Sequence, residues 1–156
     1  MIYYVTFGVV GFVIIGFFVL SVFEKKRLDK IKNDMLDLLS RYGNMDIDSG
    51  KTLFNFQNQQ IEVLFFTLKS VEELVINSRV MWEIFRANKA MLIDQTEFLK
   101  SQNYKWIIIY PSISRIKRYI NENEMVFIKH HDQIYDYQLI LWVELEEYLE
   151  DMKNGI

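Results

Sequence analysis

The chain opens with Met1-Ile-Tyr-Tyr-Val-Thr-Phe-Gly-Val-Val-Gly-Phe-Val-Ile-Ile-Gly-Phe-Phe-Val-Leu-Ser-Val-Phe23, which has no charged side chain and no proline. As a helix, Ile2 to Phe23 would rise about 33 Å, against a hydrocarbon core of about 30 Å. A helix of this length in a soluble core carries a polar stripe, and this segment has none. The sequence therefore predicts a single transmembrane helix over residues 1–23.

This apolar segment is predicted to remain on the protein as an uncleaved signal anchor. A cleaved signal peptide has a basic region before a shorter apolar core, and small residues at its cleavage site. No Lys or Arg precedes the apolar run here, and the run ends in bulky side chains from Phe17 to Phe23. The sequence also contains no cysteine, so lipid attachment through a thiol is excluded.

A basic segment follows the apolar one and predicts the orientation of the protein. Its Lys and Arg residues are Lys25, Lys26, Arg27, Lys30 and Lys32. Positive charge beside a transmembrane helix is retained in the cytoplasm. We therefore expect a single-pass protein of the cell membrane, with its N-terminus outside and its C-terminal domain in the cytoplasm. The same side chains are expected to contact anionic lipid, each contributing about 1 kcal/mol near the surface.

Residues 24–43 are predicted to form a basic amphipathic juxtamembrane helix. Apolar residues recur at spacings of three and four along it, and Gly43 is the expected C-cap. This apolar stripe consists of Leu28, Ile31, Met35, Leu38 and Tyr42. Either the stripe packs on the protein's own domain or, as two heptads, it forms the seam of a weak homodimer.

Residues 44–156 are predicted to form one cytoplasmic domain of the α+β (mixed α/β) class, a mixed β-sheet flanked by helices. Segments rich in β-branched and aromatic residues predict strands, and a positive φ at Asn58 would turn a hairpin between the first two. The predicted strands are 52–56, 60–68, 80–85, 105–110 and 125–128, and the predicted helices are 96–102, 112–120 and 141–152. Asn44 to Lys51 is expected to be a loop, 70–73 a helical turn, and the strands from Tyr104 onward a parallel pair.

The side chains that usually perform catalysis are few, and no catalytic, cofactor-binding or metal site is predicted. The sequence has no thiol nucleophile and no glycine-rich phosphate loop. His130-His131-Asp132 fits a solvated turn, because no second histidine cluster completes a metal site. Asp46 and Asp48 lack the further oxygen ligands of a calcium loop. Arg115, Lys117 and Arg118 fit a solvated helix face.

One comparison of element order supports an alternative function. The order helix, three strands, helix, strand, helix resembles that of restriction-endonuclease-like domains. The resemblance implies a metal-dependent nuclease or phosphodiesterase with Glu62 as an acidic ligand and a Glu-x-Lys motif on the next strand. Here Glu83-Ile-Phe85 has phenylalanine in place of the lysine, so such a domain would be inactive. Asp46 is a further candidate ligand.

The preferred interpretation is a non-enzymatic binding domain held at the membrane. A tether raises the effective concentration of a domain near other membrane components. The expected partners are the lipid bilayer and a protein, with a weak homodimer as an alternative. The formal net charge of −3 gives no overall basic excess, so nucleic acid is not expected as a partner.

Overall fold

The computed structural model describes residues 2–48, 50–87, 89–111, 116–121, 124–128 and 132–155. Within these ranges it describes side chains from Ile14 onward, apart from those of residues 120 and 121. The fold is α+β, with a long N-terminal helix and mixed β-sheets.

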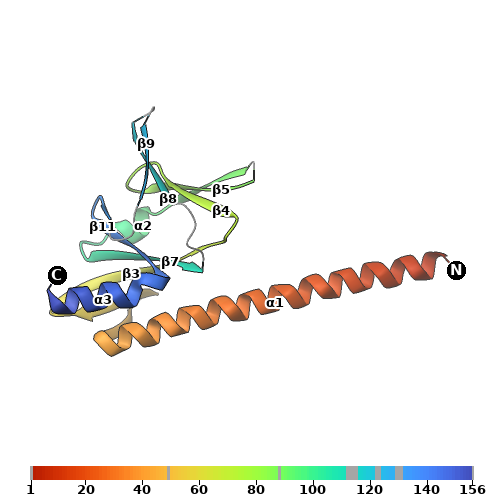
Figure 1. Ribbon diagram of the computed structural model, residues 1–156, viewed down its shortest axis with the longest axis horizontal. Helices are drawn as coiled ribbons and strands as arrows, with labels where there is room; N and C mark the ends of the chain where they lie inside the picture. Colours follow the sequence, from red (N-terminus) through yellow and green to blue (C-terminus); the bar gives the residue numbers. More distant parts are fainter. Residues whose placement is uncertain are drawn as a thin grey trace.

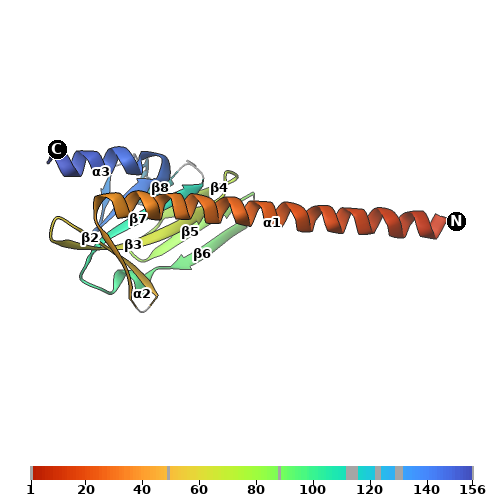
Figure 2. The ribbon, with the colours of Figure 1, turned by 90° about the horizontal axis from the view of Figure 1, so that it is seen from below.

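Helix α1 runs without interruption from Ile2 to Tyr42. It therefore joins the predicted anchor and the predicted juxtamembrane helix into one rod, whose N-terminal half extends away from the sheets (Figures 1 and 2). Large apolar side chains are exposed on this projecting part, including Phe17 at 71%, Phe18 at 70% and Phe23 at 66%. Where side chains are described, no helix is long and apolar enough to cross a membrane.

The described strands form two mixed sheets. In spatial order, the first sheet contains β1 (Asn44–Asp48), β2 (Lys51–Phe56), β3 (Gln59–Leu68), β7 (Tyr104–Pro111), β11 (Tyr137–Leu141) and β10 (Gln133–Ile134). The second contains β6 (Lys89–Asp94), β5 (Met81–Arg86), β4 (Glu72–Ile76), β8 (Ile116–Asn121) and β9 (Glu124–Phe127). The remaining elements are α2 (Thr96–Leu99), a 3₁₀ helix η1 (Trp142–Glu144) and α3 (Leu145–Asn154).

Strand β7 lies in the middle of the molecule, and both of its faces are covered. Its parallel neighbours are β3 and β11. Trp106 and Ile108 face a core formed with α1 and α3, whereas Ile107 and Ile109 face a core formed with the second sheet. The layers are therefore helices, first sheet and second sheet (Figure 1). This arrangement confirms the prediction that 60–68 and 105–110 are buried strands covered on two sides.

The apolar stripe of α1 packs on the protein's own sheet. Ile31, Met35 and Leu38 are buried in the core between α1, α3 and the first sheet, and Leu28 and Tyr42 pack against it. The side chains proposed for a homodimer seam are thus engaged within the chain. Gly43 directly follows the helix but lacks the positive φ of the expected glycine C-cap. Glycine fits there because a Cβ would lie 2.3 Å from the carbonyl oxygen of Asn55.

The β2–β3 hairpin and the C-terminal helix confirm their predictions. Gln57 and Asn58 both have positive φ, as a two-residue turn between antiparallel strands requires. Helix α3 begins at Leu145, slightly later than expected, because the chain first completes β11 and η1.

Three local predictions were wrong. Residues 44–48 are an edge strand rather than a loop; an edge strand pairs through its backbone and tolerates polar side chains. Of the predicted helix 112–120, residues 112–115 lie outside the described part, and Ile116–Asn121 is strand β8, parallel to β4. The predicted helical turn at 70–73 is a β-turn leading into β4, closed by a hydrogen bond from the Glu72 amide to the Lys69 carbonyl (2.9 Å).

The element order that resembles restriction-endonuclease-like domains is not the order of this fold. The third predicted strand, 80–85, corresponds to β5 and lies in the second sheet, and the helix expected after β7 is replaced by β8. The parallel partners of β7 are β3 and β11 rather than the strand at 125–128, which is β9 in the second sheet.

A charge placed at Ile108 should destabilise the whole domain. Ile108 is fully buried in β7 against the helices, so Ile108→Asp should lower the free energy of unfolding by several kcal/mol. Urea unfolding of the full-length protein in detergent micelles, followed by tryptophan fluorescence, measures this. Ile47→Asp is the control, because Ile47 is 73% exposed on edge strand β1. Equal effects of the two substitutions would contradict the burial of β7.

Candidate functional site

A buried ion pair joins the two central strands of the first sheet. Glu62 on β3 and Lys105 on β7 occupy paired positions, and their side chains are 2% and 0% exposed. The Lys105 ammonium donates to Glu62 Oε2 (2.9 Å) and to the Ser101 hydroxyl, which in turn donates to the same carboxylate. Lys51 on β2 reaches the other oxygen, Glu62 Oε1, at 3.1 Å.

This network keeps the Glu62 carboxylate ionised in the interior. Burial alone would raise the pKa of Glu62, but hydrogen bonds from Ser101 and from the two lysines outweigh it and hold the pKa below its usual range. The ammonium of Lys105 also lies 5.3 Å from the centre of the Phe98 ring. Both ions are paired and hydrogen-bonded, which is the arrangement of a structural pair rather than of a base awaiting a substrate.

The acidic residues considered for a metal site do not converge. Glu62 lies in the first sheet beside Lys105, Glu83 lies on β5 of the second sheet, and Asp46 is exposed on edge strand β1. Among the described residues, no three His, Asp or Glu side chains lie close enough to hold a metal ion. His130 and His131 lie outside the described residues, as does Arg115.

The predicted basic helix face between residues 112 and 120 has a different structure. Lys117 and Arg118 lie on strand β8. Lys117 forms an ion pair with Glu73, and the Arg118 guanidinium lies 4.4 Å from the centre of the Tyr135 ring. Both cations are thus engaged within the domain.

The basic residues predicted to contact lipid are exposed along α1, just after its projecting part. Lys25, Lys26, Arg27, Lys30 and Lys32 all have exposed side chains. Lys32 lies 5.4 Å from the centre of the Phe65 ring on β3. Arg27 differs from the others because it lines a cavity.

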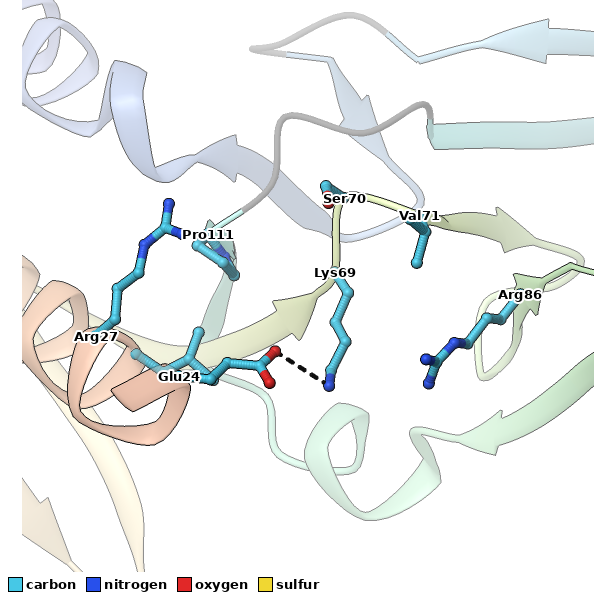
Figure 3. Close-up of a pocket in the computed structure, with 8 residues that line it drawn as sticks. Glu24, Arg27, Lys69, Ser70, Val71, Arg86 and Pro111 are labelled. Atoms are coloured by element: carbon cyan, nitrogen blue, oxygen red, sulfur yellow. Dashed lines mark ion pairs between the residues drawn. The ribbon is translucent and has the colours of Figure 1, made fainter. Parts of the chain in front are cut away.

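This cavity, of about 360 Å³, lies between α1 and the turns of both sheets. It is lined by Glu24, Arg27 and Leu28 of α1, Lys69, Ser70 and Val71 of the β3–β4 turn, Arg86 of β5 and Pro111 of β7. Lys69 forms an ion pair with Glu24 at 3.2 Å, and Arg86 extends from the opposite side toward Lys69 (Figure 3). Among the described residues, three cations and one carboxylate line the space, so it favours an anion.

The β3–β4 turn has a fixed shape at the cavity. Besides the backbone hydrogen bond that closes the turn, the Lys69 amide donates to Glu72 Oε2 at 2.9 Å. Ser70 and Val71 are therefore held at the tip, where Val71 is 67% exposed. The cavity wall combines fixed cations with an exposed apolar side chain.

Sequence reasoning found one of the cavity's cations and missed two. Arg27 belongs to the basic segment after the anchor, which local charge density identifies. Lys69 and Arg86 are isolated in the sequence, and only the pairing of β4 with β5 brings them to the same end of the domain as α1. The Glu62–Lys105 pair was also missed, because it depends on the parallel pairing of β3 with β7.

Comparisons with protein-family models, with curated proteins and with solved structures found no match.

Removing one partner of the buried ion pair should be costly. Lys105→Met leaves a buried carboxylate without its main counter-ion, and we expect a loss of about 3–5 kcal/mol in the free energy of unfolding. Glu62→Leu combined with Lys105→Met should recover most of that loss. Lys100→Met is the control, because Lys100 and its partner Glu97 are 73% and 89% exposed and such surface pairs contribute at most about 1 kcal/mol. A small effect of Lys105→Met in urea unfolding would contradict the pair's burial.

The same ion pair should make the free energy of unfolding depend on pH in the acidic range. Because the pKa of Glu62 is lower in the folded protein, its contribution is complete above the ordinary carboxyl value of about 4.3 and is lost as the pH falls through the folded pKa. The free energy of unfolding, measured between about pH 6 and pH 3, should therefore fall less steeply in Glu62→Gln than in the natural protein. Glu97→Gln, at a carboxyl that is 89% exposed, should leave the slope unchanged. Identical slopes in all three proteins would refute this role of Glu62.

Proposed function

We propose that the chain is a single-pass membrane protein whose α+β domain is a non-enzymatic binding module held at the cytoplasmic surface of the cell membrane. The expected partners are the lipid bilayer and a protein. The apolar segment 1–23 would be the anchor, and the domain would recognise its protein partner close to the bilayer.

One observation carries this proposal: the first half of α1 projects from the domain, and no other described element packs around it (Figures 1 and 2). Ile14, Phe17, Phe18 and Leu20 are each 63–71% exposed. At about 25 cal/mol per Å² of apolar surface, leaving such side chains in water is strongly unfavourable. A hydrocarbon environment removes this cost, and the uncharged sequence from Ile2 onward is long enough to reach across one.

Continuity of α1 supports the idea that the domain has a defined position relative to the bilayer. The helix is uninterrupted between the projecting part and the stripe buried in the core. A flexible linker would let the domain rotate freely, whereas a helix transmits the direction of the anchor. The end of the domain that includes the β3–β4 turn and the β5–β6 hairpin would then face the membrane (Figures 1 and 2).

A binding role agrees better with the described side chains than the alternative, a nuclease or phosphodiesterase-type domain. The acids considered for that chemistry are divided between the sheets, and Glu62 is engaged by Lys51, Ser101 and Lys105. A metal-dependent mechanism requires acidic ligands gathered around one ion. This alternative would need ligands other than Glu62, Glu83 and Asp46.

Topology gives a direct test. Alkaline phosphatase fused after Ile156 should be inactive in cells, because the basic segment keeps the C-terminal domain in the cytoplasm, where this enzyme does not form its disulfides. A green fluorescent protein fused at the same place should fluoresce. Replacing Lys25, Lys26, Arg27, Lys30 and Lys32 with glutamine should raise phosphatase activity, whereas replacing Lys51, Lys69, Lys89, Lys100 and Lys153 should not. High phosphatase activity in the unsubstituted fusion would refute the orientation.

A further inference from the structure

We propose that the cavity between α1, the β3–β4 turn and β5 binds the phosphate group of an anionic phospholipid, with Arg86 as its main contact. The inference rests on the proposed function, because it requires the projecting half of α1 to lie in a bilayer. It assigns one lipid molecule to a defined cavity, which differs from the non-specific attraction of a basic helix to an anionic membrane surface.

The first support is the position of the cavity along α1. Arg27 follows Phe23 by four residues, which is about 6 Å along a helix. The headgroup layer is about 5–7 Å thick on each side of the hydrocarbon core. Glu24, Arg27 and Leu28 line the cavity. With the apolar segment in the hydrocarbon, the cavity therefore opens at the depth of the lipid phosphates.

The second support is the charge that remains available in the cavity. Of the described lining residues, Glu24 carries the carboxylate, and it is paired with Lys69. In the described residues, neither Arg27 nor Arg86 forms an ion pair with a carboxylate. Glu72 lies opposite Arg86 across β4 and β5, yet its Oε2 accepts from the Lys69 amide in the turn. The Arg86 guanidinium thus keeps a fork of donors that suits a phosphate group.

The third support is the apolar residue at the rim, which favours a lipid over a soluble phosphate. Val71 is 67% exposed at the tip of a turn that two hydrogen bonds close. A water-soluble anion would leave this valine in water, whereas the acyl chains of a lipid can cover it. At a bilayer surface Val71 would contact the upper acyl chains while Arg86 contacts the headgroup.

Lipid retention by the full-length protein in detergent micelles tests the proposal. The protein is titrated with phosphatidylglycerol or with phosphatidylcholine, and bound lipid is counted by native mass spectrometry. We expect one phosphatidylglycerol per chain, and weaker retention of phosphatidylcholine. Arg86→Gln should weaken phosphatidylglycerol binding about tenfold, as expected for the loss of one charge-assisted contact.

Lys89→Gln is the matched control. Lys89 pairs with Arg86 across the β5–β6 hairpin, is exposed and does not line the cavity. The two substitutions remove the same charge from the same hairpin. If lipid binds only through general surface charge, they will have equal effects, and that result would overturn the proposal. Unchanged urea unfolding of both variants shows that neither effect arises from misfolding.

Two further arms separate the alternatives. Glycerol 3-phosphate tests whether the cavity binds a free phosphate compound instead. If Arg86-dependent binding of glycerol 3-phosphate is observed and no phospholipid is retained, the proposal that the ligand is a lipid is overturned. Carbonate extraction of cell membranes tests the anchor on which the proposal rests. Release of the protein into the soluble fraction would refute the proposed function, whereas a protein that stays in the membrane but retains lipid equally with and without Arg86 would refute only the lipid site.

Discussion

The packing of α1 on the first sheet is the contact on which the rest of the structure depends. Met35 and Leu39 of α1 are almost fully buried in the same core as Phe54, Trp106 and Ile108. Without this helix, one face of β7 and its neighbours would lie in water, because α3 alone is short. The helix that projects its apolar half from the domain is therefore also a structural part of that domain. Removal of the segment between Leu28 and Tyr42, rather than of the projecting residues before it, would therefore expose the core.

The central strand β7 contains one buried lysine, which is tolerated because its ammonium is paired and hydrogen-bonded. Lys105 shares a face with Ile107 and Ile109, on the side of the second sheet. It lies near the end of the strand, where Ser101 and Glu62 reach its ammonium. Replacing such a pair with apolar residues is often neutral for stability, so the pair is better understood as fixing the register of β3 on β7. A shift by one residue would place Glu62 and Lys105 opposite apolar side chains.

Sequence patterns were sufficient where a residue's environment is set locally. The stripe from Leu28 to Tyr42 and the buried strand Lys105 to Tyr110 both follow from periodicity and length. The patterns failed where a distant strand decides the local structure. Ile113, Ile116 and Ile120 have helical spacing, yet Ile116 forms part of β8 because β4 is there to pair with it. Polar residues 44–48 form a strand because β2 supplies the backbone partners. The cavity could not be predicted from the sequence for the same reason, since Lys69 and Arg86 become neighbours of α1 only through the second sheet.

The continuity of α1 between its projecting apolar segment and the core bears on the proposed recognition at a membrane. A module on a flexible linker searches many orientations and loses binding free energy when one of them is selected. Here the β3–β4 turn is tied to α1 by the ion pair between Lys69 and Glu24, one residue after the apolar segment ends. Under the proposed anchoring, the same face of the domain would be directed toward the bilayer in every molecule, and the opposite end, with the C-terminus of α3, would be directed away from it (Figure 1).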